Sequence, residues 1–167
     1  MLAFVILILG IALRIIPHTP NFSPLIAIAL FSGVYLNKRY NLWLPLLLII
    51  LSDLIIGLHQ VILFTWGAIF LITLLGIFLR KYKNTLTVIF SSILGAFAFF
   101  IITNFGVWIL GWYPQNLTGL IGCYIMALPF FRITLMSTIF YVTCFFGIYE
   151  LLAFLAKKHS LVKILVD

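Results

Sequence analysis

The sequence predicts an all-α membrane protein with six transmembrane helices, and three observations lead to this prediction. Hydrophobic residues make up 65% of the 167 residues and charged residues only 8%, with a mean hydropathy of +1.32. Soluble domains are about 45–50% apolar and about 25% charged, so the composition excludes that class. The apolar residues form long segments, and most Lys and Arg residues lie in three short patches between or after them. No linker or repeat divides the chain, so we expect one membrane domain over residues 1–167.

Six segments are candidates for these helices. A helix needs about 20 mostly apolar residues to cross about 30 Å of hydrocarbon. The N-terminal segment lacks the positive start and the cleavage site of a signal peptide, so we expect it to stay as the first helix. Ser23 and Pro24 predict the start of the second helix, with Ser23 as N-cap and Pro24 at the first helical position. The expected helices cover residues 2–16, 24–36, 42–57, 61–79, 85–110 and 133–156.

The stretch before the last segment predicts a feature at the outer surface. Residues 118–128 are too few to span a membrane and are followed by Pro129, a residue type that interrupts helices. We expect a short outer cap helix here, with Pro129 marking the bend into the sixth helix near Arg132. Trp108 and Trp112, just before this stretch, are of the aromatic type that gathers at membrane interfaces.

The basic patches predict the orientation of the chain. Lys and Arg accumulate in cytoplasmic loops, and six spans put all three patches on one face, with the N- and C-termini both cytoplasmic. The net charge is +7. Because the basic residues lie in short loops, they indicate contact with the lipid bilayer and not with nucleic acid. The patches are Lys38 and Arg39; Arg80, Lys81 and Lys83; and Lys157, Lys158 and Lys163.

Two embedded charges of opposite sign predict an ion pair. An unpaired charge in hydrocarbon costs several kcal/mol. Arg14 stands about 20 Å up the first helix, and Asp53 stands at nearly the same height on the third, at about 1.5 Å per residue. We expect these two side chains to pair, either as a strut that fixes helix register or also as the wall of a pocket. Glu150 is expected near the cytoplasmic face, paired with a loop base such as Arg80 or Lys157.

Other polar residues fall at the same outer level and predict a solute-binding pocket. Asn104 and Trp108 share one helix face, which suits a ligand with polar edges and a flat apolar body, although Asn104 could also cap a neighbouring helix. His18 and His59 without a nearby Cys, Asp or Glu favour hydrogen bonding over metal binding. No pattern of a hydrolase is present, so we expect no catalytic residue, metal or cofactor. The expected substrate-binding residues are Arg14, His18, Asn21, Asp53, His59, Asn104, Trp108 and Arg132.

Four motifs resemble those of a family of small uncharacterised bacterial membrane proteins. They are R-x-x-P-H-x-P-N-F-x-P from Arg14, S-D-x-x-x-G-x-H from Ser52, T-N-F-G-x-W from Thr103, and A-L-P-F-F-R ending at Arg132. That family is itself similar to the substrate-binding (S) components of energy-coupling factor vitamin transporters. The resemblance implies an S-component-like bundle in the bacterial cytoplasmic (inner) membrane. It also implies a vitamin-like ligand at the outer ends of the helices and an energy-coupling membrane subunit with ATPases as partner.

The first helix departs from the S-component pattern. The Ala-x-x-x-Ala contact motif of many S components is absent, because Ala3, Gly10 and Ala12 stand at other spacings. A component that acts without a shared motor therefore stays open. The leading hypothesis is a binding component for solute uptake. The alternatives are a structural or assembly subunit whose polar cluster only locks helices, and a membrane enzyme that uses His18 and His59.

Overall fold

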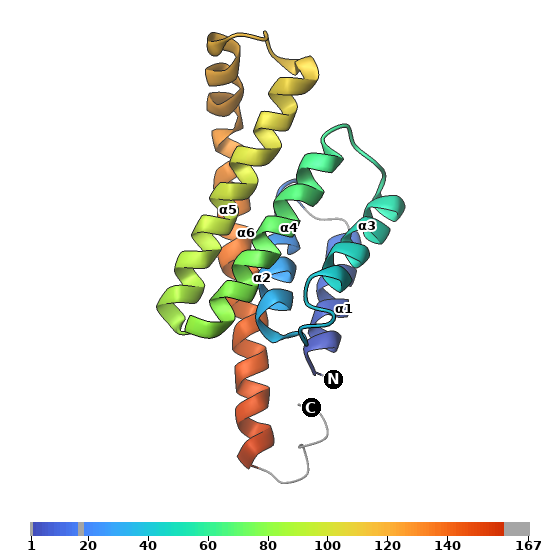
Figure 1. Ribbon diagram of the computed structural model, residues 1–167, viewed down its shortest axis with the longest axis vertical. Coiled ribbons are helices and arrows are strands. Elements are labelled where there is room, and N and C mark those ends of the chain that lie inside the picture. The colour runs from blue at the N-terminus through green and yellow to red at the C-terminus, as the bar shows by residue number, and fades with distance from the viewer. Residues whose placement is uncertain (1, 17–18, 159–167) are drawn as a thin grey trace.

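The computed structural model describes residues 2–16 and 19–158, and this part of the chain folds into six α-helices without strands (Figure 1). A 3-10 turn, η1 (Arg80–Tyr82), follows the fourth helix, and a π-helical turn, η2 (Trp108–Trp112), continues the fifth. The helices are α1 (Leu2–Ile15), α2 (Leu25–Tyr35), α3 (Trp43–Ile56), α4 (Ile62–Leu79), α5 (Thr85–Val107) and α6 (Leu117–Lys158). The all-α class and the six predicted helices are confirmed.

The helices differ widely in length. Three stretches are long and apolar enough to cross a membrane: Ile62–Tyr82, Thr85–Trp112 and Leu117–Ala156. The first three helices have 14, 11 and 14 residues. At 1.5 Å per residue they are about 21, 16 and 21 Å long, short of the roughly 30 Å of a hydrocarbon layer. These lengths and compositions indicate a membrane protein, while six complete spans stay a prediction.

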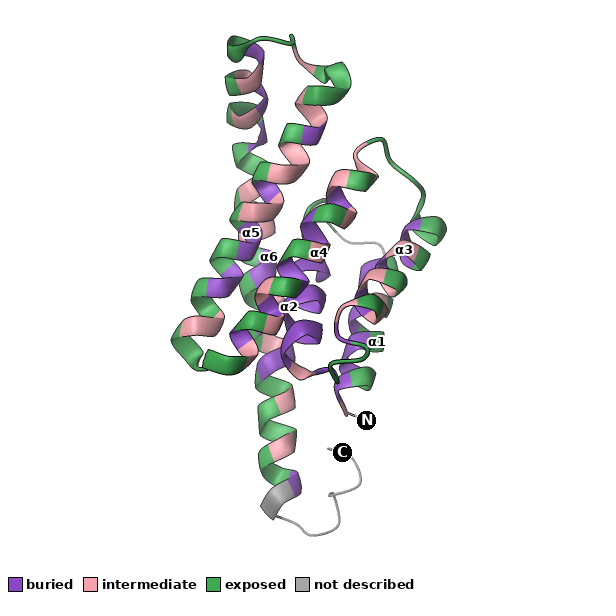
Figure 2. Ribbon diagram, in the orientation of Figure 1, coloured by how far each residue is buried: buried purple, intermediate pink, exposed green. Residues whose placement is uncertain are grey.

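The shortest helix, α2, is the centre of the body. Every residue from Leu25 to Val34 is buried (Figure 2). Ala29 and Gly33 give α2 a small residue on each of two successive turns, a spacing that lets helices approach closely in lipid. A Cβ atom added at Gly33 would lie only 2.7 Å from the carbonyl carbon of Gly76 in α4. The backbones of α2 and α4 therefore touch at a pair of glycines.

The start of α2 differs from the prediction. Pro24, and not Ser23, is the N-cap residue, and no side chain caps the helix. The carbonyl oxygen of Pro24 accepts the first helical hydrogen bond, from the backbone N–H of Ile28 at 2.8 Å. The carbonyl oxygen of Ser23 instead lies 3.4 Å from the hydroxyl of Ser137 in α6. The loop that enters α2 is thus in contact with α6.

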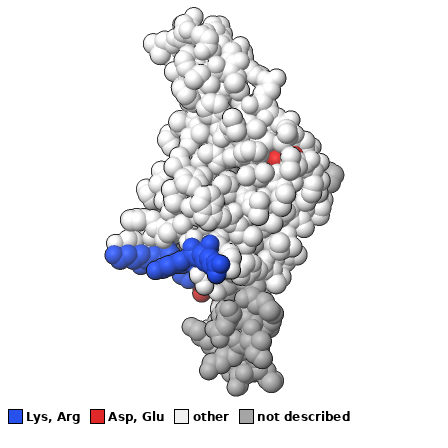
Figure 3. All heavy atoms as spheres, turned by 45° about the vertical axis from the view of Figure 1, so that its right-hand side comes forward, with Lys and Arg blue, Asp and Glu red and all other residues white. Residues whose placement is uncertain are grey.

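The Lys and Arg residues of the first two basic patches lie together at one end of the molecule, as the orientation prediction requires. Arg80 donates from Nε to the carbonyl oxygen of Val34 at 2.7 Å and also to that of Leu36, which joins η1 to the loop that carries Lys38 and Arg39. The Lys and Arg side chains visible in Figure 3 form one band, and most of the remaining surface in that view is uncharged. We call this region the basic end. Whether it faces the cytoplasm stays a prediction.

The last part of α6 also reaches the basic end. Glu150 forms an ion pair with Lys83, so its expected pairing with a loop base is confirmed. The base is not Arg80, because the guanidinium of Arg80 binds the backbone at the end of α2. The side chain of Lys157 lies outside the described part of the chain. The third basic patch begins in the last turn of α6, beyond Glu150.

The predicted cap helix is wrong. α6 runs through 42 residues without a break, with Pro129 inside it. Its first turns lie antiparallel to α5, and together they form a hairpin that projects beyond α4 (Figure 1). The hydroxyl of Tyr124 donates to the carbonyl oxygen of Ile101 across this hairpin at 2.9 Å. Packing against α5 stabilises residues 118–128 as part of the long helix, and the one hydrogen bond that Pro129 removes does not end it.

Candidate functional site

A cavity of about 490 Å³ lies on the side of the molecule away from the basic end, where the α1–α2 and α3–α4 loops meet α5 and α6. This volume is within the range of about 300–1,000 Å³ that small-molecule sites occupy. Four phenylalanines from α5 and α6 form much of its apolar wall: Phe99, Phe100, Phe130 and Phe131. Its polar lining residues are Arg14, Asn21, Ser23, His59, Thr65, Thr103, Asn104 and Thr134.

The cavity brings together half of the residues that the sequence singled out. Arg14 comes from the end of α1, Asn21 from the α1–α2 loop, His59 from the α3–α4 loop and Asn104 from α5. Asp53 lies beside this group as the ion-pair partner of Arg14. The structure thus brings these positions together, while their part in binding a solute stays a prediction. His18 lies outside the described residues.

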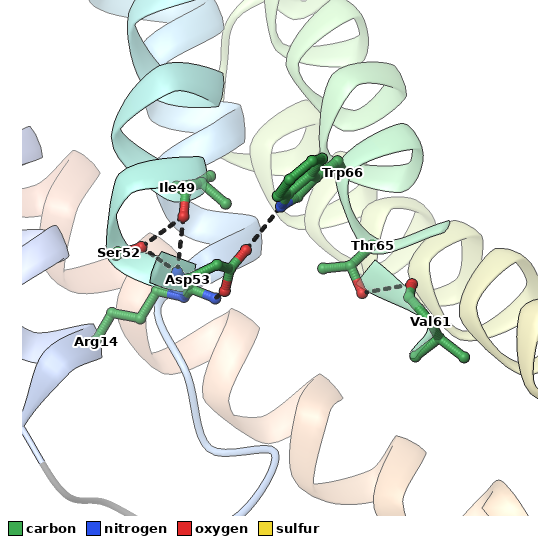
Figure 4. A network of polar contacts seen from close by, with 7 residues as sticks. All are labelled: Arg14, Ile49, Ser52, Asp53, Val61, Thr65 and Trp66. Carbon is green, nitrogen blue, oxygen red and sulfur yellow. Dashed lines mark hydrogen bonds and ion pairs between the residues drawn. The ribbon is translucent and has the colours of Figure 1, made fainter. Parts of the chain in front are cut away.

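The predicted ion pair between Arg14 and Asp53 is confirmed (Figure 4). The guanidinium contacts one carboxylate oxygen of Asp53 and also donates to the hydroxyl of Ser52 and, at 3.2 Å, to the carbonyl oxygen of Ile49. The indole N–H of Trp66 donates to the other carboxylate oxygen at 2.7 Å. Arg14 is 8% exposed and Asp53 1% exposed. One buried acid thus connects α1, α3 and α4.

Arg14 is both a strut and a wall of the cavity. A guanidinium has five N–H donors. Its bonds to Ile49, Ser52 and Asp53 use three of them within the described part of the chain. The remaining donors can serve an acceptor in the cavity that Arg14 lines. A carboxylate, phosphate or carbonyl oxygen is the group that this geometry suits best.

Two exposed loops supply the side chains at the rim. Asn21 has a backbone φ of 64°, in the left-handed region that Asn tolerates better than most residues. Its carbonyl oxygen lies 3.4 Å from the hydroxyl of Ser137, which holds the loop against α6. His59 follows Gly57, whose φ of 118° ends α3. The two polar side chains therefore approach the cavity from opposite loops.

Asn104 lies deeper, on α5. Its amide nitrogen donates to the carbonyl oxygen of Phe100 in the same helix at 2.8 Å, so the alternative that it caps a neighbouring helix is wrong. The hydroxyls of Thr103 and Thr134 likewise donate to carbonyl oxygens one turn back, at 2.8 and 3.1 Å. Such bonds satisfy the hydroxyl donors and leave the hydroxyl oxygens able to accept from a ligand.

Two predicted residues do not line the cavity. The indole N–H of Trp108 donates to the carbonyl oxygen of Pro114 at 3.0 Å, because the chain enters the π-helical turn at this residue. Arg132 is exposed on α6, although Phe130, Phe131 and Thr134 around it line the cavity. Each residue turns an α-helix by about 100°, so the side chain of Arg132 leaves on another face. Neither side chain therefore belongs to the candidate site.

Sequence reasoning missed Trp66 and the threonines. Trp66 had a usable signal, since an indole N–H in an apolar segment needs an acceptor and the sequence has just three acidic residues. Thr65, Thr103 and Thr134 had none, because a threonine in an apolar helix usually bonds to its own backbone. Among residues 2–16 and 19–158, no group of three or more His, Cys, Asp or Glu could hold a metal ion.

The cavity combines a guanidinium, amides, an imidazole and hydroxyls with a phenylalanine wall. Comparison with curated proteins and with solved structures found no match. Comparison with protein families found one whose model matches residues 1–161, which is nearly the whole chain. The chain belongs to this family, a family of unknown function designated DUF6580.

Proposed function

We propose that the protein is a membrane-embedded binding component for the uptake of a small polar or amphipathic solute, such as a vitamin-like micronutrient. The observation that carries this proposal is the convergence of Arg14, Asn21, His59 and Asn104 on one cavity of about 490 Å³. These side chains come from four segments far apart in the sequence. Packing alone does not require polar groups from so many segments to meet around an open volume.

The lining indicates the chemistry of the solute. Arg14 favours a ligand with an anionic or carbonyl group at the inner side of the cavity. His59 and Asn21 offer donors and acceptors at the rim, where a second polar group would lie. The phenylalanine wall, including Phe100 and Phe131 with ring centroids 4.8 Å apart, suits a flat apolar body between these groups.

Uptake also requires an orientation and a source of energy. With the basic end in the cytoplasm, the cavity opens toward the outside, where a solute would be captured. We propose on this basis a multi-pass protein of the bacterial inner membrane with both termini in the cytoplasm. The sequence has no G-x-x-x-x-G-K pattern for nucleotide phosphates. ATP-driven uptake would therefore use a separate energy-coupling subunit, as the resemblance to S components implies.

Native mass spectrometry of the protein purified gently from its host tests the proposal. We expect a stoichiometric small molecule to copurify. His59→Ala and Asn104→Ala should each reduce its occupancy or affinity by about 5- to 100-fold, the effect of removing one hydrogen-bonding partner. Gln60→Ala is the matched control, because Gln60 neighbours His59 in the same loop but contacts Trp112 and does not line the cavity.

The network around Asp53 favours a second candidate, a structural or assembly subunit. Asp53 accepts from both Arg14 and Trp66, which is sufficient to lock three helices. This candidate predicts that Asp53→Ala unfolds the protein while His59→Ala and Asn104→Ala have no measurable effect and no molecule copurifies. That combination of results would reject the binding proposal.

A further inference from the structure

A second cavity, of about 520 Å³, lies at the basic end between α2, α5 and α6. Among the residues that the structure describes, the two cavities share no lining residue. Its long wall is apolar, with Val88 and Ile89 from α5 and Ile139, Val142 and Phe146 from α6. Ile89 is 45% exposed and Ile139 41% exposed, so the cavity opens toward the surroundings of the protein. From Ile139 to Glu150 the wall runs about 16 Å along α6.

The end of this cavity at the basic end holds a pair of opposite charges. Lys83 Nζ pairs with Glu150 Oε1 and lies 3.2 Å from the hydroxyl of Tyr35, and that hydroxyl donates to Glu150 Oε1 at 2.5 Å. Lys83 Nζ also lies 4.6 Å from the centroid of the Tyr35 ring. The side chains of Lys83 and Glu150 are 33% and 52% exposed, so a ligand at the mouth can reach both.

We propose that this cavity binds phosphatidylethanolamine, with one acyl chain along the apolar wall and the headgroup at Lys83 and Glu150. The phosphate of this lipid would accept from the Lys83 ammonium, which has three N–H donors. The primary ammonium of the lipid would donate to the Glu150 carboxylate, which can accept several hydrogen bonds. Each charged group of the headgroup would thus contact a protein side chain of the opposite charge.

Other headgroups fit the pair less well. Phosphatidylglycerol would satisfy Lys83 but would place an uncompensated negative charge beside Glu150. Phosphatidylcholine has the correct charges, but its quaternary nitrogen has no N–H to donate to the carboxylate. The location supports a lipid over a soluble ligand, because Lys83 directly follows η1 at the basic end, where we expect lipid headgroups to meet the protein.

Gly147 provides a variant that blocks the cavity without disturbing the fold. It lines the cavity, and a Cβ added there would meet no atom within 4 Å. Gly147→Leu therefore places a side chain in the empty volume, and leucine is a better helix former than glycine. Gly122→Leu is the matched control, since Gly122 lies on the same helix, also has no atom within 4 Å of an added Cβ and lines neither cavity.

The test uses the full chain in nanodiscs of equimolar phosphatidylethanolamine, phosphatidylglycerol and phosphatidylcholine. The protein is released into mild detergent, and retained lipid is counted by native mass spectrometry. We expect one phosphatidylethanolamine per protein, about fivefold over each other lipid, the scale of one partly exposed ion pair. Gly147→Leu should lose this lipid and Gly122→Leu should keep it. Equal retention by these variants, a preference for phosphatidylglycerol, or no retained lipid would overturn the proposal.

A double variant, Lys83→Gln with Glu150→Gln, separates the headgroup from the acyl chain. We expect it to retain lipid but without preference among the three headgroups, because the apolar wall is unchanged. A preference for phosphatidylethanolamine that survives this double change would show that the charge pair does not recognise the headgroup. Thermal unfolding of each variant in the same detergent verifies that the fold is intact.

Discussion

At the scale of single residues, Asp53 has the largest expected effect on stability. It is buried and accepts from Arg14 and Trp66, so its loss leaves the Arg14 charge without its partner. Asp53→Asn keeps the shape of the side chain and removes only the charge. We expect it to lower the free energy of unfolding by about 3–5 kcal/mol, the usual cost of breaking a buried ion pair from one side. Unfolding in detergent, followed by circular dichroism, measures this.

Trp66→Phe is the control for the same network. It removes the indole hydrogen bond to the carboxylate of Asp53 and leaves the ion pair with Arg14 in place. A hydrogen bond to a charged group contributes about 1.5–3 kcal/mol, so this variant should lose less stability than Asp53→Asn. If both variants lost the same amount, the ion pair would add nothing beyond an ordinary hydrogen bond.

At the scale of helices, the contact between α2 and α4 depends on Gly33 and Gly76. A Cβ at Gly33 would lie 2.5 Å from the carbonyl oxygen of Thr73, which is backbone and has no room to move aside. We expect Gly33→Ala to lower the free energy of unfolding by about 1–3 kcal/mol, the usual cost of overpacking. The same detergent unfolding experiment measures it.

Gly67→Ala on α4 is the comparison for this substitution. No atom lies within 4 Å of a Cβ added at Gly67, so the new methyl group meets nothing. The higher helix propensity of alanine should then leave stability unchanged or raise it by up to about 1 kcal/mol. A Gly33→Ala variant as stable as Gly67→Ala would contradict the close contact between the two helices.

At the scale of the whole molecule, the testable property is orientation. The basic end should face the cytoplasm, and the α5–α6 turn should face the other side. Alkaline phosphatase, which is active only outside the cytoplasm, should therefore be active when inserted at Gln115 in this turn. It should be inactive when inserted at Lys38 in the α2–α3 loop at the basic end. The reverse pattern would invert the topology and with it the direction in which the first cavity opens.

The sequence by itself determined the all-α class, the six helices, the shared location of the basic loops and the pairing of Arg14 with Asp53. The helices could be predicted because each one is a local apolar segment. The ion pair could be predicted because the chain has few charged residues, so an embedded charge has few possible partners. Polar side chains at one level of a helix bundle tend to meet, and for this reason the sequence predicted a shared site for Arg14, Asn21, His59 and Asn104.

Only the tertiary structure decided the rest. α6 continues through Pro129 because α5 extends far enough to pack against its first turns. The lining of the cavity depends on how each helix is rotated about its own axis. The observed rotations turn Arg132 away from the cavity and turn Thr65 and Thr103 toward it. The rotation of a helix about its axis and its continuity through a proline are set by side-chain packing against segments far apart in the chain. Local sequence patterns do not specify that packing.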